Sequence, residues 1–181
     1  RSEDILRELR ERVKRSEERH EKISRDLERK NRELLKEHRE RSEKLKRELE
    51  ELVKRVEDRG LPEERLKELR KIAEEVDREL EEMDRRVEEM NERLDRRLEE
   101  LDDENRKKVK EIKRKLDEDA KRGEEAEDLA RRVDETIKDH ERHSEEVKRD
   151  VTEKIKENEK LSRDIVRRVE KLLRDLEREV R

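Results

Sequence analysis

The segment Asp58-Arg59-Gly60-Leu61-Pro62-Glu63-Glu64 lies between two long stretches of helical pattern and decides how they are arranged. Gly60 is expected at the C′ position of the first helix, because glycine adopts the left-handed conformation without steric cost. Pro62 is expected near the first position of the next helix, where its missing N–H is not needed, and the acidic residues after it favour a helix start. Because the turn is so short, the two helices must be antiparallel neighbours.

A second turn of the same kind follows at Lys121-Arg122-Gly123-Glu124-Glu125. Basic residues close one helix, Gly123 turns the chain, and acidic residues begin the next helix, although no Ser, Thr or Asp cap is present. We therefore expect three helices, near residues 2–59, 62–121 and 124–181, joined by loops at Gly60 and Gly123.

Each predicted helix carries one apolar stripe, which we call its seam. The seams run from Leu6 to Val56, from Leu66 to Leu116 and from Ala126 to Leu176, and each covers 50 residues in 14 steps of three or four. The mean step of about 3.57 lies between the 3.5 of a left-handed coiled coil and the 3.6 of a straight helix. The predicted fold class is all-α: an elongated up-down-up three-helix bundle with a weak left-handed supercoil, forming a single domain over residues 1–181.

The composition excludes several classes of protein. Of the 181 residues, 56 are Lys or Arg and 60 are Asp or Glu, the net charge is −4, and there is no aromatic residue and no Cys. Such compensated charge lacks the field that attracts nucleic acid or an anionic membrane. The missing aromatic residues exclude β architectures, and the missing Cys excludes disulfides and thiol chemistry. With no apolar run long enough to span a membrane and no targeting signal, we expect a soluble chain that binds neither nucleic acid nor membrane.

Polar residues on or beside the seams are the candidate functional residues. If the chain folds at its two turns, facing positions on the first two helices have numbers that sum to about 121, and the first and third helices align at an offset of about 124. Ser16 then falls beside Asn105 and His140, and His20 lies beside Ser144. Two further groups are expected along the bundle. The complete predicted buried polar network is Ser16, His20, Asn31, His38, Ser42, Asn91, Asn105, His140, Ser144, Thr152, Asn158 and Ser162.

The grouping of these residues indicates hydrogen-bonded layers. Asn31 is expected to meet Asn91, with Thr152 beside them, and His38 and Ser42 are expected to join the third group, which contains Asn158 and Ser162. A buried polar group without a partner costs about 1 to 3 kcal/mol, so clustering lets each donor find an acceptor. The predicted role is registry, because a helix that slides along its neighbours would bury these groups unpaired.

Two chemical alternatives for the same residues are less favoured. A metal site could use His20 and His140, and Glu17 precedes His20 as in the Glu-x-x-His element of di-iron bundles. That element occurs once here, and no Glu lies on a seam. General acid-base catalysis needs a cleft and a perturbed carboxylate, which a thin three-helix bundle does not offer. We therefore expect no enzyme activity, no catalytic residue, no metal, no cofactor and no small-molecule substrate.

The histidines suggest a response to pH. His20, His38 and His140 lie on seams that contain no carboxylate, so burial is expected to lower the pKa of each imidazole. A carboxylate that reaches in from the rim would reverse the shift for one of them. His143 is expected at the rim and should contribute least.

The equal seams, the Gly turns, the almost wholly charged surface and the polar seam layers together resemble de novo designed helical bundles with buried hydrogen-bond networks. The resemblance covers the whole chain and rests on its general sequence features, since the chain has no catalytic motif. It implies a structural scaffold or an interaction module that has no native substrate. A spectrin-like repeat is a weaker alternative, because such repeats bury aromatic residues.

Two roles stay open on the sequence. The chain is either a self-contained monomeric scaffold or a helical interaction module that completes its seam with partner helices or self-associates. A fourth helix would need a broad apolar face. The apolar residues outside the seams widen them only intermittently, which favours a closed monomer; they are Leu35, Val53, Ile72, Leu129, Leu161, Val166 and Leu173.

Overall fold

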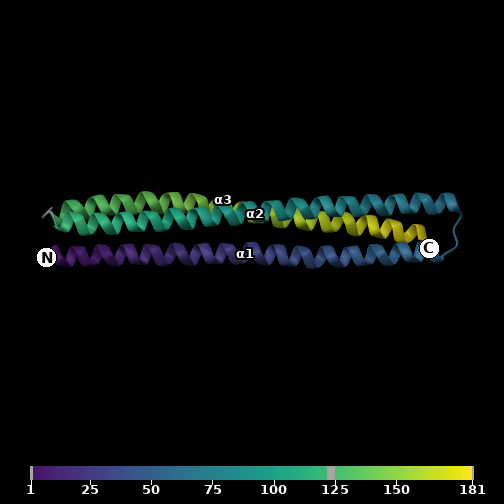
Figure 1. The fold of residues 1–181 in the computed structure, drawn as a ribbon, viewed down its shortest axis with the longest axis horizontal. Coiled ribbons are helices and arrows are strands. Elements are labelled where there is room, and N and C mark those ends of the chain that lie inside the picture. The colour runs from purple at the N-terminus through teal and green to yellow at the C-terminus, as the bar shows by residue number, and fades with distance from the viewer. Residues whose placement is uncertain (1, 122–124, 181) are drawn as a thin grey trace. The chain divides into compact units, whose positions relative to one another are not determined.

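Three helices make up the chain: α1 (Ser2–Asp58), α2 (Glu63–Lys121) and α3 (Ala126–Val180) (Figure 1). The computed structural model describes residues 2–121 and 125–180, and no strand occurs within them. The prediction of an all-α three-helix bundle is confirmed, and the helix ends differ from the predicted ones by two residues or fewer. The predicted loop at Gly123 lies outside the described residues.

The turn between α1 and α2 has the predicted chemistry with a shift of one position. Gly60 has a φ of 66°, the left-handed conformation in which glycine ends helices. The carbonyl of Pro62 accepts the first helical hydrogen bond, from the N–H of Leu66, at 3.0 Å. Pro62 is therefore the N-cap residue and stands just before the helix, and Glu63 and Glu64 supply the acidic first turn of α2.

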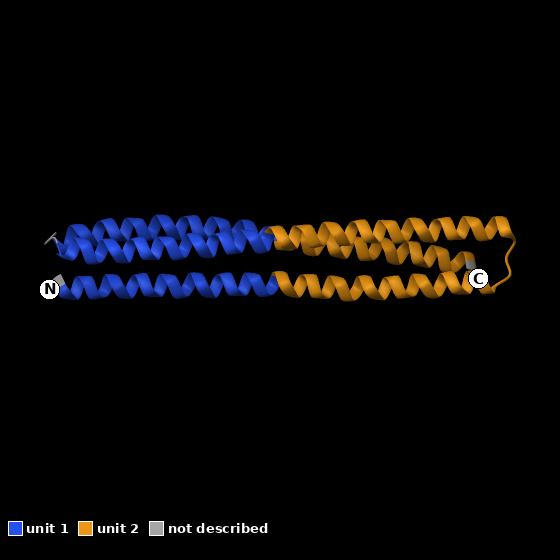
Figure 2. Ribbon diagram, viewed as in Figure 1, with its two compact units in different colours: residues 1–30, 94–154 blue, residues 31–93, 155–181 orange. Residues whose placement is uncertain are grey.

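Two compact units divide the chain, and each contains a segment of all three helices (Figure 2). Unit 1 consists of residues 1–30 and 94–154, and unit 2 consists of residues 31–93 and 155–181. As α1 advances, its partners on α2 recede: Arg10 meets Asp117 and Ser24 meets Asp102 in unit 1, and Asn31 meets Asn91 and Ser42 meets Asp84 in unit 2. In unit 1 the α3 partners advance with α1, from Arg12 with Asp134 to Ser16 with Glu141, and in unit 2 α3 is antiparallel to α2, from Asn158 with Val87 to Arg168 with Glu79. Within each unit α2 therefore runs antiparallel to α1, and α3 runs parallel to α1.

Each unit has its own aliphatic core. In unit 1, one cluster is formed by Leu9, Val13, Val109, Ile112, Leu116, Leu129, Val133 and Ile137. In unit 2 the buried apolar residues include Leu34, Leu45, Leu49, Leu69, Val76, Leu80, Val87, Ile155, Ile165, Val169 and Leu173. The seams are confirmed over most of their length, with local exchanges. Ser24 is buried where Ile23 was expected, and Leu173 is buried where Leu172 was expected.

Two contacts between α1 and α2 in unit 2 keep the predicted sum of about 121: Asn31 with Asn91 and His38 with Asp84 both sum to 122. The two serine contacts, Ser24 with Asp102 in unit 1 and Ser42 with Asp84 in unit 2, sum to 126. Helical side chains lean toward the N-terminus of their helix, so in an antiparallel pair they lean in opposite directions and the partner lies farther along α2. In a parallel pair the two leans match, and His38 and Ser162 of α1 and α3 keep the predicted offset of 124.

Candidate functional site

The most connected polar cluster lies in unit 2 around His38, which is 1% exposed. Its Nε2 lies 2.7 Å from Asp84 Oδ1, and its Nδ1 lies 2.6 Å from Ser162 Oγ. Ser42 Oγ donates to the other carboxylate oxygen of Asp84 at 2.6 Å, and Lys46 Nζ lies 3.2 Å from that oxygen. All three helices of unit 2 therefore contribute to one hydrogen-bonded cluster.

The charge state of Asp84 decides which nitrogen of His38 carries the proton. Burial opposes ionisation, but the hydrogen bonds from His38, Ser42 and Lys46 outweigh it and hold the pKa of the Asp84 carboxyl below its ordinary value. An ionised carboxylate only accepts hydrogen bonds, so Nε2 must carry a proton. In the neutral imidazole Nδ1 is then the acceptor, and the Ser162 hydroxyl donates to it.

Asp84 is a carboxylate that reaches in from the rim toward one seam histidine, the exception that the sequence left open. It is a rim residue with 18% of its side chain exposed, and it reaches in toward His38. The sequence shows Asp84 directly after Met83, one position off the predicted seam, and a short side chain at such a position can point inward. Asp84 therefore gives His38 Nε2 a hydrogen-bond partner, which the Nε2 atoms of His20 and His140 lack.

A second cluster in unit 2 pairs Asn31 with Asn91, as predicted. Asn31 Nδ2 donates to the main-chain oxygen of Asn91 at 3.0 Å, and Asn91 Nδ2 donates to the main-chain oxygen of Asn31 at 2.6 Å. Asn91 Nδ2 also lies 2.9 Å from Asn31 Oδ1. Both side chains are buried, so each amide binds the facing helix in place of water. Thr152 belongs to unit 1 and is only partly buried.

Asn158, predicted to join His38 and Ser42, binds elsewhere in unit 2. Its Nδ2 donates to the main-chain oxygen of Val87 at 3.3 Å, which links α3 to α2. Its Oδ1 is buried without a hydrogen-bond partner. This buried acceptor is a local weakness of the unit 2 core, because an unsatisfied polar atom costs about 1 to 3 kcal/mol.

The polar contacts of unit 1 differ from the predicted pairs. Ser16 Oγ donates to Glu141 Oε1 at 3.3 Å, and neither Asn105 nor His140 is its hydrogen-bond partner. Ser144 Oγ donates to Asn105 Oδ1 at 3.2 Å, whereas we expected Ser144 beside His20. Ser16 and Asn105 thus each bind a residue of α3, Glu141 and Ser144, and not each other.

Ser24 and Asp102 form a contact in unit 1 that the sequence prediction missed. Ser24 is buried, and its hydroxyl donates to Asp102 Oδ1 at 2.6 Å. Asp102 follows Leu101 directly, as Asp84 follows Met83, so both carboxylates flank an apolar seam residue of α2. A short acidic residue beside a seam, facing Ser on the neighbouring helix, is the signal that would have found both.

His20 and His140 lie together in unit 1 with their ring centres 5.3 Å apart and their planes at 71°. His20 is buried, and His140 is partly buried. The Nε2 atoms of both rings are buried and have no hydrogen-bond partner. The two rings thus contact each other edge to face and leave two ring nitrogens unsatisfied.

The pKa of each of these two imidazoles lies below its ordinary value. For His20, burial lowers the pKa, Glu141 and Glu145 oppose the shift, and Arg19 adds to it. For His140, burial is again the largest cause, Coulombic interactions with His20, Lys108 and His143 lower the pKa further, and Glu104 opposes them. Both rings are therefore neutral at neutral pH, as we expected from their seam positions.

His143 is a rim residue, as predicted. Its side chain is 53% exposed, and Nε2 lies 3.0 Å from Glu104 Oε2 on α2. His143 and His140 are three residues apart on α3, but His140 lies against His20 whereas His143 faces Glu104.

The burial of the predicted network is largely as expected. Ten of its twelve residues are buried: Ser16, His20, Asn31, His38, Ser42, Asn91, Asn105, Ser144, Asn158 and Ser162. His140 and Thr152 are partly buried. The predicted members are therefore mostly inside, while several of their hydrogen-bond partners are rim carboxylates that the prediction left out.

Ser162, His38 and Asp84 are the three residue types of a hydrolase triad, but their arrangement differs from it. In that triad the serine binds Nε2 and the carboxylate binds Nδ1, whereas here the two nitrogens are exchanged. Ser162 is 4% exposed, which leaves no approach for a substrate carbonyl. The chemistry open to this cluster is hydrogen bonding between helices.

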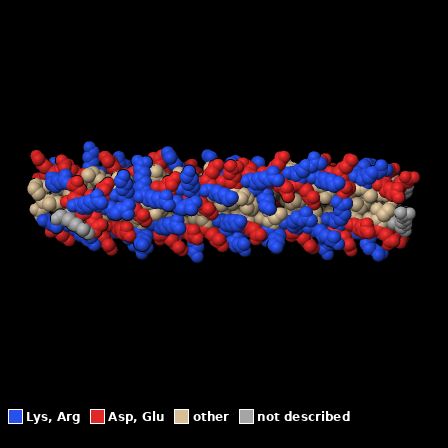
Figure 3. Space-filling view, turned by 180° about the vertical axis from the view of Figure 1, so that it is seen from behind, with Lys and Arg blue, Asp and Glu red and all other residues tan. Residues whose placement is uncertain are grey.

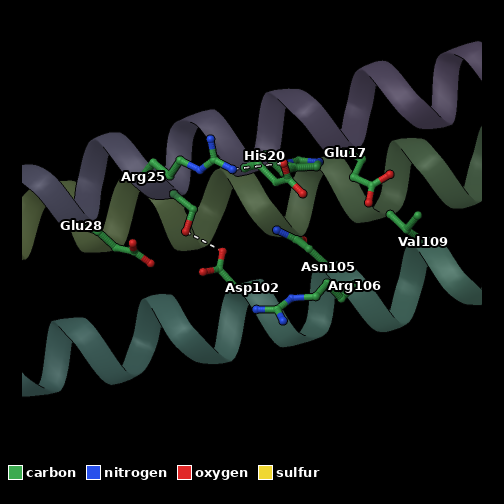
Figure 4. A pocket seen from close by; sticks show the side chains of 10 residues that line it. Glu17, His20, Arg25, Glu28, Asp102, Asn105, Arg106 and Val109 are labelled. Carbon is green, nitrogen blue, oxygen red and sulfur yellow. Dashed lines mark hydrogen bonds and ion pairs between the residues drawn. The ribbon is translucent and has the colours of Figure 1, made fainter.

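A groove of about 370 Å³ opens on unit 1 between α1 and α2 (Figure 4). His20, Ser24, Asp102, Asn105 and Val109 line it, together with charged residues at its edges. In Figure 4 a dashed line joins Asp102 to the neighbouring helix, and it marks the hydrogen bond that Ser24 donates. Polar side chains of both helices thus face this groove.

The surface mixes charges of both signs. In Figure 3 the Lys and Arg side chains alternate with Asp and Glu over the visible face, and neither sign covers a large area. Within the described residues no three His, Asp or Glu side chains are placed to hold a metal ion together. Among those residues, none of the helices has a stretch apolar enough to cross a membrane.

Comparison with protein-family models, with curated proteins and with solved structures finds no match for this chain.

Proposed function

We propose that the chain is a structural scaffold without a substrate, whose helices are held in register by buried polar contacts between aliphatic layers. The observation that carries the proposal is the reciprocal contact of Asn31 and Asn91. Each amide donates to the main-chain oxygen of the other residue's helix, so the contact forms at one relative position of α1 and α2 in unit 2. The cluster of Asp84 and His38 adds a second such contact in the same unit.

The buried polar contacts disfavour alternative registers of the helices more than they raise the stability of the native one. A slip of one heptad moves a helix by about 10 Å, which would separate Asn31 from Asn91 and leave their amides buried among Leu and Val. Each orphaned donor or acceptor then costs about 1 to 3 kcal/mol. Aliphatic seams alone discriminate weakly, because Leu and Val can meet Leu and Val again after the slip.

Equal helices, equal seams, two Gly turns and charged surfaces around polar core layers support an origin by de novo design, as a helical bundle of coiled-coil type. On this proposal the chain has no natural substrate, cofactor or location, and its buried polar residues serve the specificity of folding.

Replacement of Asn31 and Asn91 together by Leu tests the proposal. The double variant should keep or exceed the parent's thermal stability, because apolar replacement of a buried polar pair is often neutral or favourable. It should lose uniqueness, seen as a mixture of species in sedimentation equilibrium and as extra amide signals in NMR spectra. The single variant Asn31→Leu should be less stable than the double variant, because it leaves the Asn91 amide without its partner.

A matched control changes the same number of buried side chains in unit 2 without touching a polar group. Leu34→Met with Leu80→Met conserves volume at two buried positions and should leave one species. If the Asn double variant stays monodisperse and gives one set of NMR signals like this control, the polar contacts do not set the register.

One observation favours the second role, a helical interaction module. A groove of about 760 Å³ lies between α1 and α2 of unit 2, with Leu49, Val53 and Ala73 at its base and charged side chains along its rim. Ile72 of the same unit is 37% exposed. An added helix with a narrow apolar stripe fits such a groove. Sedimentation equilibrium of the parent distinguishes the roles, because self-association into a defined dimer would support the module.

A further inference from the structure

The two unsatisfied Nε2 atoms of His20 and His140 set this pair apart from the other polar contacts of unit 1. Ser16, Ser24 and Ser144 all have hydrogen-bond acceptors, whereas these two ring nitrogens are buried with none. Each such atom costs about 1 to 3 kcal/mol if it stays unpaired. Because the two rings touch each other across α1 and α3, one shared ligand would satisfy both nitrogens.

The separation of the rings matches that of two imidazoles on one tetrahedral metal ion. Zinc binds imidazole nitrogen at about 2.0 to 2.1 Å and prefers tetrahedral angles, which places the centres of two bound rings about 5 Å apart. The observed separation is 5.3 Å. Two rings in linear coordination, as copper(I) prefers, would have centres about 6 Å apart, so the spacing favours a tetrahedral ion.

We propose that His20 and His140 form a two-histidine site for a divalent transition metal, with zinc as the ion that fits best and water as the remaining ligands. No third protein ligand is placed beside them among the described residues. His20 also lines the groove of about 370 Å³ between α1 and α2, whereas His140 belongs to α3 and is not among the groove's lining residues. The site is independent of the scaffold role, which stands or falls on the unit 2 contacts.

The electrostatics of the site suit a cation. A metal ion binds the neutral form of an imidazole. Glu141 and Glu145 act on His20 and Glu104 acts on His140, and all three offer a negative potential to an ion bound between the rings. The nearest opposing charges are those of Arg19 and Lys108.

Titration of the full chain with zinc chloride at about pH 7.5, followed by calorimetry, tests the proposal. We expect one zinc ion per chain, with weaker binding than a site with four protein ligands. His20→Asn and His140→Asn should each weaken binding by at least about tenfold, since loss of an outer-shell partner alone costs that much. Cobalt(II) in place of zinc should give the absorption bands of tetrahedral coordination in the parent only.

His143→Asn is the matched control, because His143 is three residues from His140 but exposed on the rim. It should bind zinc as the parent does. Weakened binding in this variant would assign the ion to a surface pair of His140 and His143 and overturn the proposal. Equal binding by the parent and the double variant of His20 and His140 would overturn it too. Circular dichroism checks the fold of each variant, and zinc-induced NMR shifts of the His20 and His140 rings in the parent need no variant at all.

Discussion

Replacement of Asp84 by Ala should lower the free energy of unfolding by about 3 kcal/mol. The carboxylate accepts hydrogen bonds from His38 at 2.7 Å and Ser42 at 2.6 Å, and both donors are buried. Truncation leaves the two donors without an acceptor, at a cost of about 1 to 3 kcal/mol each. The ion pair with Lys46 adds less than about 1 kcal/mol because it is partly solvated. Water that enters at the exposed edge of the site can pair with the two donors, which keeps the summed loss of stability near the lower end of these costs.

Glu88→Ala is the matched control for this variant. Glu88 lies one turn beyond Asp84 on α2 and pairs with Arg39 of α1 at 3.1 Å, with both side chains exposed. An exposed pair of this kind contributes about 1 kcal/mol or less. Guanidinium chloride unfolding, followed by far-ultraviolet circular dichroism, should show a clearly lower midpoint for Asp84→Ala with an unchanged slope, and almost the parent's midpoint for Glu88→Ala.

A quadruple variant separates the loss of hydrogen bonds from the loss of packing. If His38 is replaced by Leu, Ser42 by Ala, Asp84 by Leu and Ser162 by Ala, no buried polar side chain of that cluster is left without a partner, and stability should return to near the parent's value or exceed it. The reasoning is refuted if Asp84→Ala costs no more than Glu88→Ala, because the buried donors would then have found other partners at no expense.

Two further predictions concern pH and the turn. Because the pKa values of His20 and His140 are lowered, the unfolded chain binds more protons than the folded chain near pH 5 to 6. The contribution of the two residues to stability is therefore complete above about pH 6.5 and is lost as the pH falls through that window. Unfolding measured at about pH 7.5 and about pH 5 should show that the variant with Asn at both positions loses less stability on acidification than the parent, and an equal loss of stability would contradict the prediction. Gly60→Ala should lower the free energy of unfolding by about 1 to 2 kcal/mol through backbone strain alone, since the φ of 66° is unfavourable for L-residues and an added Cβ meets no atom within 4 Å. Gly60→Asn should lower the melting temperature less than Gly60→Ala does. An unchanged melting temperature for the Ala variant would show that the turn adapts.

The fold was predictable because the seams and the glycine turns recur along the sequence and indicate the same arrangement of helices. Gly60 and the seams follow from local rules that hold without knowledge of the partner helix. The parallel register of α1 and α3 was predictable too, since matching leans cancel, and the contact of His38 with Ser162 follows directly. The antiparallel register was predicted to within one residue for Asn31 with Asn91. Counting residues from the turn locates the backbone but ignores the direction of the side chains, so the partners of Ser24 and Ser42 were missed.

The partners of the buried residues were harder to predict than their burial. Asp84 and Glu141 are hydrogen-bond acceptors for buried groups, yet in the sequence each is one acidic residue among 60 Asp and Glu. Nothing in composition distinguishes a carboxylate that turns inward from one that faces water. Ser24 was missed for a related reason, because Ile23 beside it is the more apolar choice for the seam while the geometry of the helix places Ser24 inside.

Because the side chains lean along their helices, pairs of substitutions that compensate each other in functional variants of this chain should show a pattern. Between α1 and α2, the residue numbers of such pairs should sum to more than the value counted from the turn, as they do for Ser24 with Asp102 and Ser42 with Asp84. Pairs between α1 and α3 should show no displacement. The displacement differs from pair to pair: Asp84 meets His38 at a sum of 122, Ser42 at 126 and Lys46 at 130. Covariation between helices would therefore report their relative direction as well as their proximity.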